Sequence, residues 1–134
     1  MSRENVEVVE RVIAAVNHRD IDSYLACCTE DIQLQTPWAA IEGVYEGPDA
    51  IRRFFVDIED IGPDFRIEVE RLVSSGEDQV LAFLRATVSG RASGIPAASD
   101  MPTANIYDLV ERKIRRIRIF LDRQQALEVA GLSE

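Results

Sequence analysis

The sequence predicts one α+β domain, in which helices encoded mainly by the first half pack on a sheet encoded mainly by the second half. Apolar residues recur at helical spacing in residues 3–16 and 51–58, whereas apolar and polar residues alternate in most of residues 65–121. A short helix closes the chain. Helices mixed with a few strands, followed by four strands in a row, are typical of an α+β fold, and residues 1–134 fit one domain with one core.

Two helices are expected at the start of the chain. Valine and isoleucine residues at steps of three and four give residues 3–16 one apolar stripe. After a turn at residues 17–19, Asp20 is a suitable N-cap for a second, shorter helix. The inward residues of that helix are expected to be Ile21, Tyr24, Leu25 and Cys28.

The next segment alternates as a strand over residues 32–36 and stops at Pro37. A loop over residues 38–47 follows. Pro48 suits the first turn of a third helix, because its missing N–H group is not needed there. The buried stripe of this helix is expected to consist of Ile51, Phe54, Phe55 and Ile58.

Two long strands are predicted beyond the break at residues 62–63, with a turn at residues 74–78 between them. The second strand, residues 79–89, is partly apolar on both faces. One face carries Val80, Ala82, Leu84, Ala86 and Val88, and the other carries Leu81, Phe83, Arg85 and Thr87. Such a strand needs helices over one face and a second cover over the other, and a second subunit is the expected second cover.

The last third of the chain contains the clearest succession of elements. A small-residue loop at residues 91–100 precedes strands at residues 101–110 and 116–121, and the final helix begins after Asp122 and stops at Gly131. These strands complete the sheet.

The connection between the last two strands is irregular in its sequence. Ile114 has the wrong parity for the last strand, so a bulge or loop end is expected near Arg115. Glu111 and Arg112 occupy the turn itself. A primed two-residue turn would force Arg112 to positive φ at a cost of about 1 kcal/mol or more, so a longer or different turn is expected.

Composition argues against several kinds of partner. Lys and Arg number 15 against 24 acidic residues, a net charge of −9, which disfavours nucleic acid and anionic membranes. No apolar run is long enough to span a bilayer, and the first residues lack a signal-peptide pattern. Adjacent Cys27 and Cys28 are interpreted as reduced thiols in a cytoplasmic protein. The single histidine, His18, is interpreted as a surface residue and leaves no set of ligands for a metal.

Three stretches carry a family resemblance. They read VIAAVNHRDIDSYLACCTEDIQLQTP, VYEGPDAIRRFF and VERKIRRIRIFLDRQQALEVAGL, and together they cover nearly the whole chain. Their order and spacing resemble the SnoaL-like branch of the nuclear transport factor two-like superfamily, which includes ketosteroid isomerases, limonene epoxide hydrolases and polyketide cyclases. The resemblance implies a curved, mixed but mostly antiparallel sheet wrapped around the N-terminal helices as a cone. It also implies an apolar pocket in the mouth of the cone and a homodimer formed by the outer sheet face.

The resemblance also implies which residues line the pocket. The principal candidates for ligand binding are Tyr24, Thr36, Trp38, Tyr45, Phe55, Arg85, Asn105, Tyr107 and Ile119. Phe54, Phe83, Thr87 and Leu109 are expected on the same wall.

The same resemblance leaves the catalytic residues unidentified. Relatives use buried carboxylates as general bases, whose pKa values an apolar cavity tunes. The steroid-isomerase Asp corresponds to Thr36, and the two Asp residues of the epoxide-hydrolase pattern correspond to Thr87 and Ile119, although its Arg is kept as Arg85. The cyclase His and carboxylate correspond to Asn105 and Ile119. The usual bases are therefore replaced by neutral side chains.

Each candidate also has a structural interpretation. Arg85 could anchor an anion or a carbonyl with its fixed fork of donors, or it could pair with Glu68 or Glu70 across the hairpin. Trp38 could form a wall or lid of the pocket or belong to the core, whereas core packing is favoured for Phe54 and Phe55. Asn105 and Tyr107 share one strand face and could donate hydrogen bonds to a ligand oxygen or satisfy one another.

Three functions remain open at this point. The first is a homodimeric module that binds a small, mostly apolar ligand without a cofactor. The second is an isomerase, cyclase or dehydratase acting on a carbonyl-bearing molecule, with its base supplied by another residue. The third is a protein–protein interaction domain that uses the outer face of the sheet.

Overall fold

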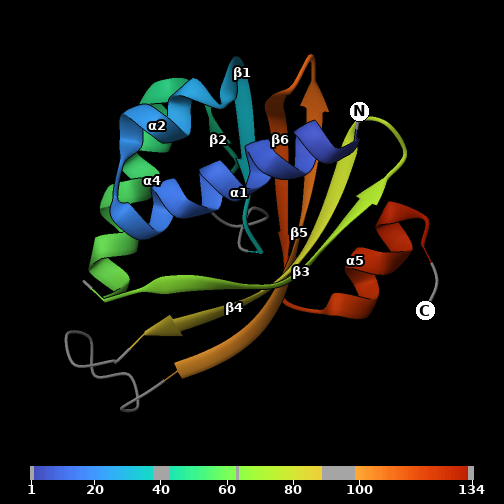
Figure 1. Ribbon diagram of the computed structural model, residues 1–134. Coiled ribbons are helices and arrows are strands. Elements are labelled where there is room, and N and C mark those ends of the chain that lie inside the picture. The colour runs from blue at the N-terminus through green and yellow to red at the C-terminus, as the bar shows by residue number, and fades with distance from the viewer. Residues whose placement is uncertain (1, 38–42, 63, 89–98, 133–134) are drawn as a thin grey trace.

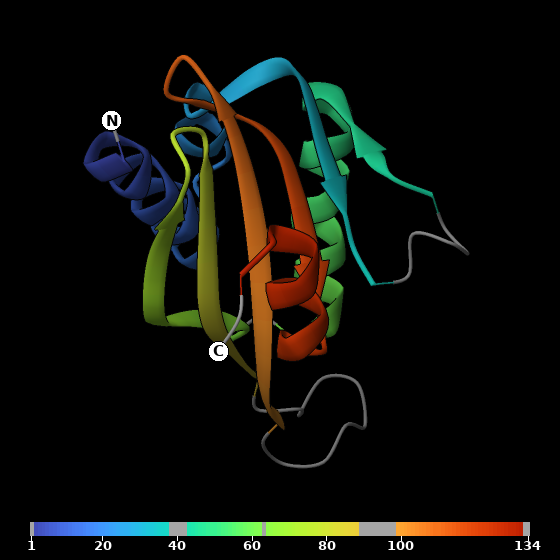
Figure 2. The ribbon, with the colours of Figure 1, turned by 90° about the vertical axis from the view of Figure 1, so that its right-hand side faces the viewer.

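The structure is a computed structural model, and it describes residues 2–37, 43–62, 64–88 and 99–132. Helices α1 (Ser2–His18), α2 (Ile21–Ala26) and α4 (Gly47–Ile61) lie on the inner side of a curved sheet (Figure 1). Helix α5 (Arg123–Ala130) lies on the opposite side of the sheet (Figure 2). The chain is therefore an α+β fold, as the sequence predicts, and α5 adds a third layer that the sequence analysis does not predict.

The strands of the described ranges form one sheet with the order β2-β1-β6-β5-β4-β3. Their bounds are β1 Cys28–Gln35, β2 Tyr45–Glu46, β3 Arg66–Ser75, β4 Gln79–Val88, β5 Ser99–Val110 and β6 Lys113–Phe120. Strands β1 and β6 run parallel, and all other neighbours are antiparallel. The sheet is mixed but mostly antiparallel, and its curve around the helices gives the expected cone shape (Figure 1).

Short-range sequence signals set the ends of the two short helices. The Asp20 carboxylate accepts a hydrogen bond from the backbone N–H of Ser23 at the start of α2. Asp122 accepts from the N–H groups of Gln124 and Gln125 at the start of α5, and Gly131 ends α5 in the left-handed conformation. These capping predictions are confirmed.

Cys28 does not lie on the second helix as expected. Helix α2 stops at Ala26, and Cys28 is the first residue of β1, where its backbone opposes Ile114 of β6. Both cysteines are free thiols. Burial raises the pKa of Cys28 to about 12, so its thiol stays protonated at neutral pH.

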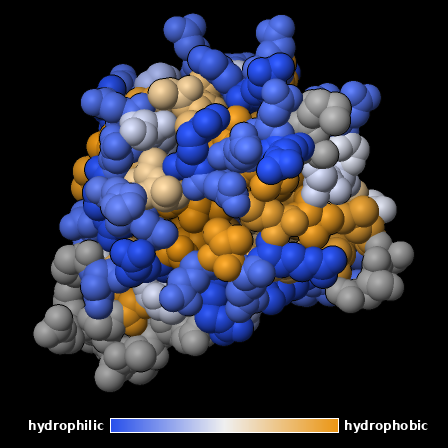
Figure 3. All heavy atoms as spheres, in the orientation of Figure 1, coloured by the Kyte–Doolittle hydropathy of each residue, from blue (hydrophilic) through white to orange (hydrophobic). Residues whose placement is uncertain are grey.

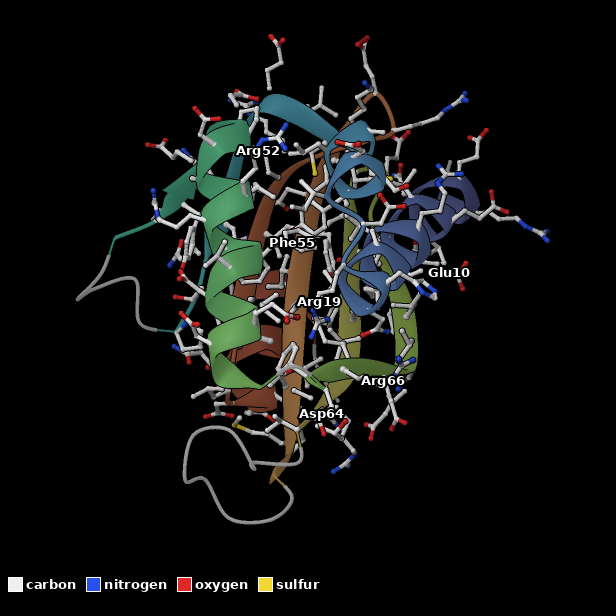
Figure 4. The ribbon with its side chains drawn as sticks, turned by 90° about the vertical axis from the view of Figure 1, so that its left-hand side faces the viewer. Glu10, Arg19, Arg52, Phe55, Asp64 and Arg66 are labelled. Carbon is white, nitrogen blue, oxygen red and sulfur yellow. The ribbon has the colours of Figure 1, made fainter. Side chains whose placement is uncertain are left out.

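The main core lies between the inner helices and the concave face of the sheet. Helix α4 contributes Ile51, Phe55 and Ile58, all nearly inaccessible, and Figure 4 shows Phe55 pointing from α4 toward the sheet. The strands contribute a matching inner row: Ile32, Leu34, Val80, Ala82, Leu84, Tyr107, Leu109, Ile114 and Ile117. The helical stripes predicted from spacing therefore point inward.

A second, smaller core lies between α5 and the outer face of the sheet. Ala126 and Leu127 of α5 pack on Leu81, Ala104 and Ile106 of β4 and β5. The helix crosses this face in Figure 2. The chain's own last helix thus covers the outer face of β4 around Leu81, and a second subunit over the rest of this face stays a prediction.

The free edge of β3 is closed by the end of α1. The side-chain amide of Asn17 donates to the carbonyl of Ile67 at 2.8 Å and accepts from the N–H of Ile67 at 2.8 Å. The guanidinium of Arg19 donates to the carbonyl of Phe65 at 3.0 Å and also pairs with Glu59. These side chains occupy backbone groups that an unpaired edge strand would otherwise expose.

The β5–β6 connection gives one confirmed and one wrong prediction. Asp108 opposes Arg116 while Leu109 opposes Ile114, so Arg115 is the extra residue of a bulge, as expected. Val110 pairs with Lys113, and Glu111 and Arg112 have φ angles of 50° and 65°. The loop is therefore a two-residue turn with both central residues at positive φ, and the expected longer turn is wrong.

The surface is mostly polar, with one visible apolar band below α1 (Figure 3). The band runs over β3 toward α5, where Val69 and Val129 are exposed. Among the described residues, no helix is both long enough and apolar enough to cross a membrane. The loop expected at residues 91–100 lies mainly outside the described residues, although Ser99 and Asp100 belong to β5.

Candidate functional site

An apolar cavity of about 320 Å³ opens between α4 and the concave face of the sheet. Its described lining comes from α4, β3, β4, β5 and β6, and from residues that directly follow β1, precede β3 or follow β6. The lining residues are Thr36, Pro37, Phe54, Ile58, Phe65, Ile67, Leu84, Ala86, Val88, Met101, Thr103, Asn105, Ile119 and Leu121. A volume of this size accommodates a molecule of two or three fused rings.

Strand β4 determines where the cavity forms. Its even-numbered residues face inward, and Ala86 stands between Leu84 and Val88 in the cavity wall. A methyl side chain at this position leaves space that a larger residue would fill. The cavity also continues past the ends of the packed core, because Met101 and Leu121 remain 43% and 47% exposed at its rim.

No side chain in the described lining of the cavity is ionisable. Asp64, which Figure 4 labels in the connection between α4 and β3, is exposed and is not part of the lining. The described wall thus contains no carboxylate that could act as a general base. Its polar side chains are Thr36, Thr103 and Asn105.

Asn105 is the most deeply buried polar group of this wall, with 6% exposure. Its amide nitrogen Nδ2 donates a hydrogen bond to the hydroxyl of Tyr107 at 3.0 Å. Its oxygen Oδ1 is buried and has no hydrogen-bond partner among the described residues. Burial raises the pKa of Tyr107 to about 12, so the phenol is neutral at physiological pH.

The candidate residues of the sequence analysis separate into several groups. Thr36, Asn105 and Ile119 line the cavity, as does Phe54. Tyr24, Phe55 and Tyr107 are buried in the neighbouring core, and the rings of Tyr24 and Phe55 meet edge to face at 5.3 Å. Leu109 belongs to the same core.

Of the two remaining aromatic candidates, Tyr45 lies elsewhere. The Tyr45 hydroxyl donates to Asp57 of α4 at 2.5 Å, and its ring contacts Phe54 at a centroid distance of 5.5 Å. Tyr45 borders a separate, polar hollow with Arg53 and Asp57 instead of the apolar cavity. Trp38 lies outside the described residues.

The placement of Arg85 in the cavity wall is wrong. Arg85 is an odd-numbered residue of β4 and therefore points to the outer face with Phe83 and Thr87. Its guanidinium pairs with Glu70 of β3 at 2.7 Å, which is the cross-hairpin ion pair considered as the alternative. Phe83 packs against the outer core under α5, so it does not line the cavity either.

Glu70 connects Arg85 to the last helix. It also accepts from Arg123 at 2.7 Å, and Arg123 donates to the Leu84 carbonyl at 2.7 Å. The Arg123 guanidinium lies 5.5 Å from the centre of the Phe83 ring. Hydrogen bonds from Arg85 and then Arg123 lower the pKa of Glu70. This network ties α5 to the sheet and explains Arg85 structurally.

Sequence reasoning missed several cavity residues, above all Leu84, Ala86 and Val88. Alternation separated the two faces of β4 correctly, but both faces are partly apolar. Arg85 itself could have indicated which face of β4 is outside. A charged residue is rarely fully buried, so the face that carries it is more often the one toward solvent. Thr103 and Met101 share the inward parity of Asn105 and could have been found by extending that strand.

Metal binding finds no support in the described ranges, which contain no group of three or more His, Cys, Asp or Glu residues arranged to hold an ion. The cavity itself offers oxygen and nitrogen atoms of only a few neutral side chains.

The fold and the apolar inner cavity define the class of this protein: a cone-shaped α+β domain of the nuclear transport factor two-like type. The family model described as the SnoaL-like domain matches residues 9–117. The chain therefore belongs to the SnoaL-like domain family. None of the curated proteins has a sequence that matches it.

Solved structures share this fold at low sequence identity. TerC, crystallised with polyporic acid, is similar with a TM-score of 0.76 and 18% identity, over 96% of this chain and 98% of that one. A protein from Jannaschia sp. assigned as a SnoaL-like polyketide cyclase has a TM-score of 0.74 and 20% identity. The match covers 99% of this chain and 95% of that one. A protein from Kribbella flavida assigned as a ketosteroid isomerase has a TM-score of 0.72 and 15% identity. The match covers 89% of this chain and 78% of that one.

Proposed function

We propose that this protein binds a small, mostly apolar, uncharged molecule in the cavity between α4 and the sheet. The observation that carries this proposal is the chemistry of the wall, which in the described residues is almost entirely apolar and carries no ionisable side chain. Transfer of apolar surface from water into such a cavity is favourable, whereas a charged ligand would lose its hydration without a counter-ion. The co-crystallised TerC supports the proposal as a protein of the same fold studied with a small organic molecule.

The same cavity wall favours ligand binding over catalysis as the function of this protein. Acid–base catalysis on a carbonyl compound needs a titratable group within hydrogen-bond reach of the reacting atom. The described lining offers Thr36, Thr103 and Asn105, none of which is a base near neutral pH.

Two free cysteines, Cys27 and Cys28, support a reducing compartment such as the cytoplasm.

The proposal can be tested by filling the cavity. Ala86→Leu places a larger side chain in the wall, and Thr87→Leu makes a matched change at the next residue, which faces outward. The methyl ether of β-naphthol is a suitable neutral, fluorescent probe. We expect wild type and Thr87→Leu to bind it equally and Ala86→Leu to lose at least tenfold in affinity, with all three proteins folded by circular dichroism. Equal binding by Ala86→Leu would place the probe elsewhere and refute the cavity as the site.

We also propose a homodimer through the part of the outer sheet face that α5 leaves open. A groove there is bordered by Asp31, Gln33, Glu46, Gly47, Asp108, Val110, Arg115 and Arg116. Carboxylates and guanidinium groups lie within one patch, so two copies related by a two-fold axis can place opposite charges together. Light scattering at micromolar concentration is expected to give the dimer mass, and Arg116→Glu is expected to shift it toward monomer. A wild-type monomer would exclude this interface.

A further inference from the structure

An open hollow of about 390 Å³ lies beside α5 on the outer face of the sheet, away from the apolar cavity. Figure 2 shows α5 over this side of the sheet. The described residues that line the hollow are Glu70, Arg71, Phe83, Arg123, Gln124 and Leu127. Two guanidinium groups and one carboxylate are among them, so this hollow has a different chemistry from the cavity.

The one carboxylate of the described lining is already engaged. Glu70 pairs with Arg85 at 2.7 Å and with Arg123 at 2.7 Å. Arg71 is exposed, and its guanidinium forms no ion pair or hydrogen bond with any of the described residues. The hollow therefore presents a cation without a counter-ion, on a chain whose net charge is −9.

The second cation of the hollow, Arg123, is fixed in position. Its Nε donates to the carbonyl of Thr103 at 3.3 Å, and its Nη2 donates to the carbonyl of Leu84 and to Glu70, each at 2.7 Å. Nη1 makes no hydrogen bond within the described ranges, and the side chain is 31% exposed. A guanidinium held in this way loses little further freedom when it binds another acceptor.

The ring of Phe83 brings the two cations together. The guanidinium carbon of Arg71 lies 5.9 Å from the ring centre, and that of Arg123 lies 5.5 Å from it. A cation–π contact attracts the charge but leaves the N–H groups free to donate elsewhere. Two like charges at one ring repel each other, and an anion beside them relieves that repulsion.

We infer that this hollow binds the carboxylate of a small, singly charged molecule whose remaining body is aromatic or aliphatic. A guanidinium donates two parallel hydrogen bonds to a carboxylate, and Arg71 is the group free to do so. One negative charge matches this one cation, whereas a doubly charged phosphate would add excess negative charge beside Glu70. Phe83 and Leu127 offer apolar surface to the rest of the molecule. The site is separate from the cavity of the proposed function and does not depend on it.

The test compares two probes of the same shape, para-trifluoromethylbenzoate and the neutral para-trifluoromethylbenzamide, by fluorine NMR titration. The proteins are wild type, Arg71→Gln, Arg66→Gln and Ala86→Leu. Arg66 is the matched control, because it is an exposed arginine of the same strand that does not line the hollow (Figure 4). Ala86→Leu fills the apolar cavity and leaves the hollow unchanged.

We expect wild type to prefer the benzoate over the benzamide by about fivefold, the value of an ion pair at a partly exposed site. Arg71→Gln is expected to abolish this preference, and the other two variants are expected to keep it. Because Arg71 has no polar partner among the described residues, its replacement should leave the circular dichroism spectrum and the urea midpoint unchanged. Nuclear Overhauser contacts between the benzoate ring and the methyl groups of Leu127 should locate the probe.

Several results would overturn the inference. Wild type could fail to bind the benzoate at millimolar concentration or bind both probes equally, and neither result would affect the proposed function. An equal loss in Arg66→Gln would show general attraction by positive charge instead of a site at Arg71. A loss in Ala86→Leu would place the benzoate in the apolar cavity and would also contradict the outer site.

Discussion

Replacement of Asn17 by alanine is expected to weaken the edge of the sheet and, with it, one wall of the cavity. The Asn17 amide forms two hydrogen bonds of 2.8 Å with the backbone of Ile67, and Ile67 lines the cavity. Each such bond contributes about 1 kcal/mol net, and both Ile67 groups lose their partner together. The better helix propensity of alanine near the end of α1 offsets about 0.5 kcal/mol. The expected loss of unfolding free energy is therefore about 1.5 kcal/mol.

Urea unfolding followed by circular dichroism measures this loss. With a slope of about 2 kcal/mol per molar urea, the midpoint should fall by about 0.7 M. Glu10→Ala is the matched control, because Glu10 lies on the same helix, is exposed and points away from the sheet in Figure 4. The control is expected to stay within about 0.5 kcal/mol of wild type. Equal midpoints for the two variants would show that Asn17 does not hold the edge strand.

Three further experiments test other parts of the structure. Replacing Glu111 and Arg112 by Asn and Gly should raise the unfolding free energy by about 1 kcal/mol, because both positions have positive φ; a decrease in the urea midpoint would contradict this turn geometry. The lowered pKa of Glu70 stabilises the fold above its ordinary pKa of 4.5, and this contribution is lost as pH falls through the folded pKa. The stability difference between wild type and Glu70→Gln should therefore shrink in acid, and a pH-independent difference would argue against the ion pairs. Cys28 should react with iodoacetamide at pH 8 only as fast as the protein unfolds, which peptide mass spectrometry can measure; rapid labelling would contradict its burial.

Local patterns predicted the elements well, because helix stripes, caps and strand alternation depend on residues close in sequence. Asp122 and Gly131 delimit α5 as predicted, and the parity of Ile114 located the bulge at Arg115. The turn at Arg112 was not predictable in the same way. Strand pairing over β5 and β6 outweighs an unfavourable φ at one or two residues, so the absence of Asn-Gly does not exclude a primed turn.

The candidate site was predictable only in part, because a strand with two apolar faces does not indicate which face is inside. Thr36, Asn105 and Ile119 were assigned to the cavity, where they lie, whereas Arg85 was assigned to the wrong side of β4. The deciding contact is α5 on the outer face, through residues such as Leu127. That contact joins segments far apart in sequence, and periodicity carries no information about it.

The cavity persists because of what surrounds it. Side chains in a protein core normally fill the available space. Here Ala86 is small, and the closed edge at Ile67 fixes the wall of β3, so the sheet cannot collapse onto α4 at this end. Met101 and Leu121 then keep apolar surface exposed at the rim, and a bound apolar molecule would cover part of it. The affinity for such a molecule would come from this apolar surface.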